Sequence, residues 1–265
     1  MSDLIETTEG GITTLTMNRP EARNAMSADM MNGLHEALPR LAQDASVRLI
    51  ILTGAGGAFC AGGDVKSFAA SAEKGGATSG PEMRAQGLRI SMELSNLLHT
   101  MAKPTLAVIP GPAAGAGLSL ALACDLRIAA DTAKFTTAFS KVGLSGDYGG
   151  SYFLTKLVGS AKARELYFTG DVILAPEAHA LGIINRVVPA ADLEAESRIF
   201  AKKIASLPTI ALGLMKKNLN AALHGSLNDV LDLEAPNMIR CFSTNDHKGA
   251  ALAFVNKQKP EFTGT

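Results

Sequence analysis

Two short apolar runs in this 265-residue chain each end in a turn built from small residues. Residues 105–109 (TLAVI) lead into PGPAAGAGLSLALACD at 110–125, and residues 49–53 (LIILT) lead into GAGGAFCAGGD at 54–64. Small side chains let the backbone approach a ligand closely, and the apolar helix expected at 118–123 begins with unpaired N–H groups. One N–H from each turn, aimed at the same oxygen, would form an oxyanion hole.

Neither turn matches a common phosphate-binding motif. Neither contains Gly-Lys-Ser/Thr, which excludes a P-loop, and GAG at 115–117 lacks the third glycine of the dinucleotide fingerprint. Close packing of a helix on a sheet is the alternative explanation for the turn at 110–125 taken alone. The second turn of the same kind favours the oxyanion hole.

The elements that would position these turns alternate between strand and helix up to about residue 188. A hairpin is expected around Glu9-Gly10-Gly11, and Ser27 would cap a helix that Pro39 should kink or interrupt. Residues 69–80 are expected to form a loop, and from residue 192 onward the pattern is helical. This order predicts an α/β core with a helical C-terminal part.

Composition describes an ordinary globular protein, with 47% hydrophobic and 19% charged residues and zero net charge. Zero net charge argues against nucleic acid or an anionic membrane as a partner. No apolar run reaches the roughly 18 residues that span a bilayer, and MSDLIETTEG at the start lacks the apolar region of a signal peptide. We therefore expect a cytoplasmic protein with no nucleic-acid or membrane partner.

The cysteines and histidines show no pattern that indicates a metal site. The three cysteines (Cys60, Cys124 and Cys241) are an odd number without regular spacing, which favours reduced thiols. Cys60 lies in a glycine-rich turn, but a small buried hydrophobe is its expected role. The five histidines lack metal-ligand spacing, so no metal is expected.

Six segments together resemble the enoyl-CoA hydratase/isomerase (crotonase) family, in the family's order and spacing, over nearly the whole chain. The segments are NRPEARNAM, AFCAGGDV, GPAAGAGLSLALACD, AKFTTAFSKVGLSGDYGG, LYFTGDVILAPEAHALGIINRVVP and AFVNKQKPEF. Within the family, residues 116–150 are most similar to the isomerases of phenylacetate-type degradation. The resemblance implies a crotonase-like α/β spiral of ββα units at 1–190 and a helical trimerisation or lid region at 191–265.

The resemblance also implies an acyl-CoA substrate, no cofactor beyond the coenzyme A that the substrate carries, and a homotrimer or homohexamer. By position, the N–H groups of Gly63 and Ala116 would be the oxyanion donors. The coenzyme A and thioester groove would be lined by Ala61, Gly62, Gly63, Asp64, Val65 and Lys66. Arg23, with Lys257 or Lys259, would approach the nucleotide phosphates. The alternatives are a solvated surface for these cations and a loop-bracing role for Asp64.

The chain departs from the hydratases of the family at the two positions where they carry glutamates. Ser119 and Phe139 stand there, and neither side chain can do acid–base work at neutral pH. Asp147, flanked by Gly146 and Gly149, occupies the position where several isomerases and a dehalogenase of the family carry an aspartate. The alternative for Asp147 is a turn aspartate that bonds its own backbone.

One carboxylate that moves a proton between two carbons is sufficient for a double-bond shift. We therefore hypothesise an enoyl-CoA isomerase with Asp147 as proton shuttle. The alternatives are an enoyl-CoA hydratase with non-standard acid–base groups and a non-catalytic acyl-CoA-binding homologue. A dehalogenase is disfavoured because the chain has no Trp. The residues expected around the acyl group are Val65, Phe68, Phe139, Leu144 and Tyr148.

Overall fold

The computed structural model describes residues 2–64 and 80–265, and its main sheet has six strands. In spatial order these are β1 (Leu4–Glu9), β2 (Ile12–Met17), β3 (Leu49–Gly54), β4 (Thr105–Ile109), β6 (Leu126–Ala130) and β9 (Arg186–Val188). Only β1 runs antiparallel to its neighbour, as the hairpin at its turn requires. Every residue of β4 is buried, which is typical of a parallel strand covered on both faces.

A second, three-stranded sheet lies beside the first and consists of β5 (Ala113–Ala114), β7 (Lys134–Thr136) and β8 (Ile173–Leu174). Strand β5 pairs with β7 in parallel, and β7 pairs with β8 in antiparallel orientation. Strand β5 lies within the turn at 110–116, so its pairing with β7 fixes the position of that turn.

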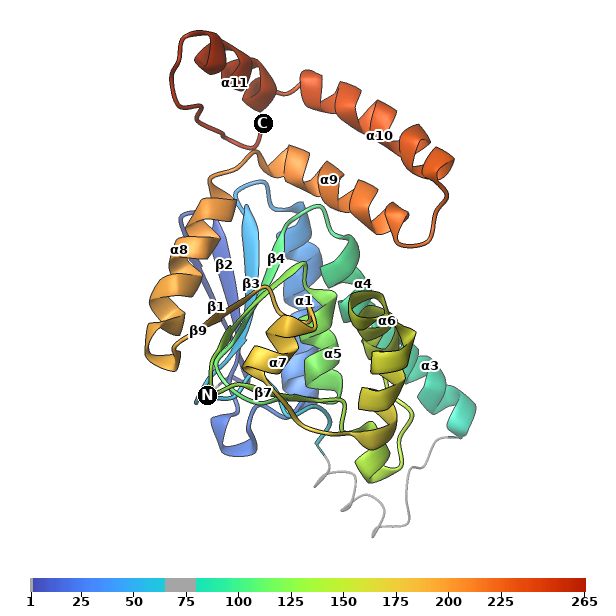
Figure 1. Cartoon of the computed structure of the whole chain (residues 1–265). Coiled ribbons are helices and arrows are strands. Elements are labelled where there is room, and N and C mark those ends of the chain that lie inside the picture. Colours follow the sequence, from blue (N-terminus) through green and yellow to red (C-terminus); the bar gives the residue numbers. More distant parts are fainter. Residues whose placement is uncertain (1, 65–79) are drawn as a thin grey trace.

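Helices cover both faces of the main sheet (Figure 1). The larger core cluster joins the sheet to α1 (Ala28–Gln43), α4 (Glu93–Thr100) and α5 (Ala116–Ala123), and the smaller one joins it to α8 (Leu193–Ala205). All eight residues of α5 are buried. The remaining helices of this part are α3 (Pro81–Ser91), α6 (Gly150–Thr169), α7 (Ala175–Ala180), η1 (Pro20–Ala22), η2 (Phe139–Val142) and η3 (Ala190–Asp192).

Helix α1 confirms one expectation and corrects another. Ser27 caps it, since its Oγ accepts a hydrogen bond of 3.1 Å from the Met30 N–H. The expected interruption at Pro39 is wrong, because the helix continues to Gln43, whereas a kink at this residue stays a prediction. Leu38 and Leu41 on either side of Pro39 are buried in the core, and this packing offsets the lost backbone hydrogen bond.

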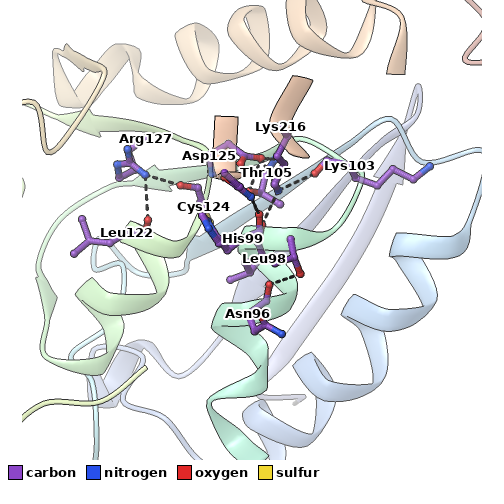
Figure 2. Close-up of polar contacts among 12 residues, drawn as sticks. Asn96, Leu98, His99, Lys103, Thr105, Leu122, Cys124, Asp125, Arg127 and Lys216 are labelled. Carbon is purple, nitrogen blue, oxygen red and sulfur yellow. Dashed lines mark hydrogen bonds and ion pairs between the residues drawn. The ribbon is translucent and has the colours of Figure 1, made fainter. Parts of the chain in front are cut away.

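The C-terminal helices α9 (Thr209–Ala222), α10 (Leu227–Phe242) and α11 (Asn245–Val255) extend beyond the sheet at the top of Figure 1. A buried polar network ties α9 to the core (Figure 2). The Lys216 ammonium lies 2.8 Å from an Asp125 carboxylate oxygen and also donates to the carbonyls of Leu98 and Lys103. The Thr105 N–H donates to the same Asp125 oxygen at 2.8 Å.

The predicted α/β core with a helical C-terminal part is confirmed. The predicted boundary at residue 190 stays a prediction, and α8, which follows it, packs on the sheet through Leu193, Ala201 and Ile204. The loop expected at 69–80 lies, except for its last residue, outside the described residues. In the described part of the chain, no helix has the length and apolar character to cross a membrane.

Candidate active site

The two small-residue turns meet in space. Cys60 forms an isolated parallel bridge with Ala113, and its carbonyl accepts a 2.9 Å hydrogen bond from the Ala114 N–H. Gly117 completes the contact, since a Cβ at this position would lie 2.4 Å from the Cys60 carbonyl oxygen. The two turns therefore pack directly against each other. The contact is so close that residue 117 cannot carry a side chain.

A methyl group at this contact should destabilise the fold. We expect Gly117→Ala to lower the free energy of unfolding by about 1–3 kcal/mol, because the Cys60 backbone must move to admit it. The matched control is Gly87→Ala in α3, an exposed helical site where a Cβ meets nothing within 4 Å. There alanine should stabilise by about 0.5–1 kcal/mol. Urea unfolding measures both, and equal midpoints for the two variants would contradict the close contact.

Each predicted oxyanion donor follows directly after a glycine with a positive φ. Gly62 has φ +86° and precedes Gly63, and Gly115 has φ +52° and precedes Ala116. A Cβ at Gly62 would lie 3.2 Å from the Ala116 nitrogen, so the two donor segments are in contact. Within the described part of the chain, no hydrogen bond occupies the N–H of Gly63 or Ala116. Ala116 is the first residue of α5, where the N–H has no partner in the helix.

The turn at 18–26 braces the loop that carries Gly63. Asn24 is fully buried and donates to the carbonyls of Ala55 and Ala58, each at 2.9 Å. An Asp64 carboxylate oxygen lies 3.4 Å from the Arg19 guanidinium, which also donates to the Ala25 carbonyl. This ion pair fits the bracing alternative for Asp64.

Asp147 lies in the turn between η2 and α6, and its carboxyl group is poorly solvated. Its Oδ1 is buried and has no hydrogen-bond partner among the described residues. This oxygen therefore does not make the backbone hydrogen bond that a turn aspartate would make. Burial raises the pKa of Asp147 from 3.8 to about 6, with no contribution from a neighbouring charge in the described part of the chain.

The Asp147 turn is linked to the turn that precedes Ala116 through Phe139. This buried ring lies 3.7 Å from a Cβ position at Gly115, the residue before Ala116, and 3.6 Å from one at Gly146, the residue before Asp147. Phe139 also stacks on Tyr167, with ring centroids 6.0 Å apart. The structure thus brings Gly63, Ala116, Phe139 and Asp147 into one region, and their predicted roles stay predictions.

Sequence reasoning missed Tyr167, which comes from α6. Its hydroxyl lies 2.6 Å from a Cβ position at Gly150, beside the Ser119 hydroxyl. Burial raises the pKa of Tyr167, and the charge of Asp147 raises it further. Helical periodicity gives no sign of this placement, because the contacts come from elements distant in sequence. The only local signal was the segment LYFTGDV, in which the tyrosine sits in a motif of the family.

Two thiols are buried: Cys60 lies in the turn at 54–64, and Cys124 follows α5 at the opposite end from Ala116. Burial raises the pKa of Cys60 and of Cys124 to about 12, so both remain protonated at neutral pH. Cys60 donates to the Asn24 carbonyl at 3.0 Å and packs in the core. The predicted role of Cys60 as a buried hydrophobe fits this setting.

Arg23 lines a cavity of about 450 Å³ together with Lys134, a cation that sequence reasoning missed. The Arg23 carbonyl accepts a 3.0 Å bond from the Ala61 N–H, so this cavity adjoins the oxyanion loop. Lys257 and Lys259 follow α11, which lies at the top of Figure 1, whereas β7 with Lys134 lies toward the bottom. Within one chain the structure does not bring these two lysines to Arg23.

Of the other predicted residues, Val65, Lys66 and Phe68 lie outside the described residues. Tyr148 is buried and Leu144 is 53% exposed. A larger cavity of about 530 Å³ lies under α9, between His99, Tyr152 and Met215. None of the predicted site residues that the structure describes lines it, so it is separate from the proposed chemistry.

The chain belongs to the enoyl-CoA hydratase/isomerase family, whose model matches residues 7–265. It is 37% identical over 269 residues to the 1,2-epoxyphenylacetyl-CoA isomerase of Escherichia coli K12, covering 100% of this chain and 99% of that protein. It is 32% identical over 262 residues to the short-chain-enoyl-CoA hydratase of Clostridium acetobutylicum, covering 98% and 97%.

Solved structures of the family have the same fold. An enoyl-CoA hydratase from Polaromonas sp. JS666 superposes with a TM-score of 0.90 at 34% identity, covering 98% of this chain and 99% of that one. The expected crotonase-like fold is therefore confirmed. Because isomerases and hydratases are both among the relatives, the comparisons define the family and its acyl-CoA chemistry but not the choice between the two reactions.

Proposed function

We propose that this protein is an enoyl-CoA isomerase that shifts a double bond of an acyl-CoA thioester. The observation that carries the proposal is Asp147, a half-buried residue whose Oδ1 is buried without a hydrogen-bond partner among the described residues and whose pKa is raised by burial to about 6. Ser119 and Phe139 supply no second carboxylate, so the usual glutamate pair of the hydratases is missing. A single base suits proton transfer between two carbons better than the addition of water.

The proposed reaction moves one proton and no other group. The Asp147 carboxylate takes a proton from C2 of a 3-enoyl thioester, and the electron pair left behind forms an enolate. The N–H groups of Gly63 and Ala116 donate to the enolate oxygen, which gains negative charge. The protonated Asp147 then returns the proton to C4, and the double bond ends between C2 and C3.

The phosphates of the coenzyme A group would meet Arg23 and Lys134, whose cavity adjoins the loop of Ala61. The acyl group would lie against Phe139 and Tyr167, an apolar wall that suits an apolar or aromatic chain. The E. coli relative, by its name, isomerises an aromatic acyl-CoA that carries an epoxide. An aromatic acyl-CoA is therefore a useful second substrate to assay.

The direct test compares a 3-enoyl-CoA with a 2-enoyl-CoA in heavy water. Absorbance follows conjugation of the thioester, and mass spectrometry follows deuterium and added water. Conjugation of the 3-enoyl substrate without a hydrated product supports the isomerase. Hydration of the 2-enoyl substrate would instead support a hydratase with non-standard groups, and no reaction with either would favour an acyl-CoA-binding homologue.

The pH dependence should report Asp147. Burial raises its folded-state pKa to about 6, so the carboxylate that acts as base is present above this pH and is lost below it. We expect kcat/KM for the 3-enoyl-CoA to be level above about pH 7 and to fall about tenfold per pH unit below about pH 6. A profile that stays level down to pH 4.5 would show that Asp147 titrates at its ordinary value or is not the base.

Assembly into a homotrimer or homohexamer remains part of the proposal. The helices α10 and α11 carry apolar side chains that are strongly exposed in the single chain, among them Leu227, Ile239 and Phe254. Large apolar side chains with this degree of exposure are typical of an interface. Light scattering on the purified protein measures the number of copies directly.

A further inference from the structure

The turn that carries Asp147 has an unusual backbone. Residues 146–150 read GDYGG, so Asp147 and Tyr148 are the two that carry side chains. Gly146 and Gly149 have φ of +109° and +74°, which glycine adopts readily, but Tyr148 also has a positive φ, of +49°. A positive φ is costly for a residue with a Cβ and is uncommon for a bulky one. Another part of the fold must therefore offset this cost at Tyr148.

Burial of the Tyr148 ring provides the offset. The residue is 5% exposed and belongs to the larger core cluster, together with Leu154 and Leu166 of α6. An aromatic ring buries a large apolar area, and the surroundings of a strained residue hold it in place. Burial also raises the pKa of the phenol, so the hydroxyl stays protonated at neutral pH and does not act as a second base. The ring therefore contributes as an anchor of the turn.

The Asp147 carboxyl has no comparable anchor of its own. Its buried Oδ1 has no hydrogen-bond partner among the described residues, so no hydrogen bond fixes this oxygen. The Asp147 carbonyl accepts a 3.1 Å hydrogen bond from the Gly150 N–H, which holds only the main chain. The position of the carboxyl thus depends on what keeps the backbone of the turn in place.

The two flanking glycines are packed closely against helix α6. A Cβ at Gly146 would lie 3.0 Å from the Tyr167 ring, and one at Gly149 would lie 2.9 Å from the Phe153 ring. These contacts limit the turn from outside. Tyr148 is the residue of the turn whose own side chain reaches into the core.

We propose that Tyr148 is the positioning residue for Asp147: its buried ring fixes the turn in the conformation that keeps the Asp147 carboxyl poorly solvated. Tyr148 acts through the backbone that the two residues share. The placement of the carboxyl is independent of the reaction, whereas the effect of Tyr148 on proton transfer rests on the proposed function.

The test follows the pKa of Asp147 without turnover. The rise in Tm that Asp147→Asn gives at pH 8 but not at pH 4 reports the raised pKa, and it is measured in the wild type and in Tyr148 variants. In Tyr148→Ala the carboxyl should turn toward solvent, so its pKa should fall from about 6 toward 3.8 and the rise in Tm should disappear. Tyr148→Phe should retain the rise, because the ring is the anchor. Tyr148→Leu, a milder truncation, should reduce the rise in part.

The matched control is Leu38→Ala in α1, which removes another buried side chain from the same core cluster. It should lower the Tm of the protein but leave the effect of Asp147→Asn unchanged. In the kinetic assay, Tyr148→Ala should lower kcat for the 3-enoyl-CoA by roughly 10²-fold with KM nearly unchanged, because the base is misplaced.

An unchanged effect of Asp147→Asn in both Tyr148→Ala and Tyr148→Leu would overturn the anchor, and so would an equal loss in Leu38→Ala. Loss of the effect in Tyr148→Phe would assign it to the hydroxyl and would also overturn the anchor. If the wild type does not turn over the 3-enoyl-CoA while the effect still depends on the ring, the proposed reaction fails and the positioning role stands.

Discussion

Asp147→Asn should lower kcat for a 3-enoyl-CoA by roughly 10²–10⁴-fold, the usual contribution of a positioned acid–base group. Asparagine has nearly the same shape but cannot take up the C2 proton at neutral pH. The rate of deuterium uptake at C2 should fall in parallel, because proton removal is the step that is lost. The matched control is Asp171→Asn, an exposed aspartate just after α6.

The same variant should be more stable than the wild type at pH 8. The Asp147 pKa is raised in the folded state, so the folded protein holds more protons than the unfolded chain between about pH 4 and about pH 6. Stability from this group is therefore present at low pH and lost as pH rises through about 6. We expect the Tm of Asp147→Asn to exceed that of the wild type at pH 8, with the difference vanishing near pH 4.

These two readouts separate a catalytic aspartate from a structural one. If Asp147 braces the turn, its replacement should make the protein less stable. If Asp147 is a poorly solvated base, its replacement should make the protein more stable. A variant with turnover within tenfold of the wild type would remove Asp147 from the mechanism. If Asp147→Asn is less stable than the wild type at pH 8, the Asp147 carboxyl is not poorly solvated and its pKa is not raised by burial.

Ala116→Pro should lower kcat/KM by roughly 10²–10³-fold or more, because it removes one of the two proposed oxyanion donors. Ala116 is the first residue of α5, a position that suits the fixed φ of proline and where no helical hydrogen bond is lost. The preceding Gly115 has no Cβ to clash with the proline ring. The helix should therefore form normally, while Cδ replaces the N–H at the point where the thioester oxygen would bind.

Circular dichroism and thermal unfolding establish that the proline variant is folded, and steady-state kinetics give the loss. Ala116→Gly is the contrasting variant, since it retains the N–H and should lose far less than the proline variant. If the two variants have the same kcat/KM, the Ala116 N–H does not stabilise the enolate.

The sequence by itself determined the parts of the site that depend on local backbone chemistry. Apolar strands followed by small-residue turns marked both proposed oxyanion loops, because glycine adopts the positive φ of Gly62 and Gly115 most readily. The family motifs predicted that Gly63, Ala116 and Asp147 share one site, and their roles stay a proposal. Helix caps such as Ser27 were also readable, since a cap bonds its own first turn.

Only the tertiary structure decided the environment of these groups. The pKa of Asp147 depends on burial by its surroundings, and Phe139 and Tyr167 reach its turn from separate elements. Lys134 and Arg23 line the same cavity. Lys134 is brought there by the pairing of β7 with β5, and no local sequence pattern encodes that pairing. Pro39 stays within α1 because core packing outweighs the local helix-breaking preference. Contacts between residues far apart in sequence arise from packing of whole elements, so they become visible only once those elements are in place.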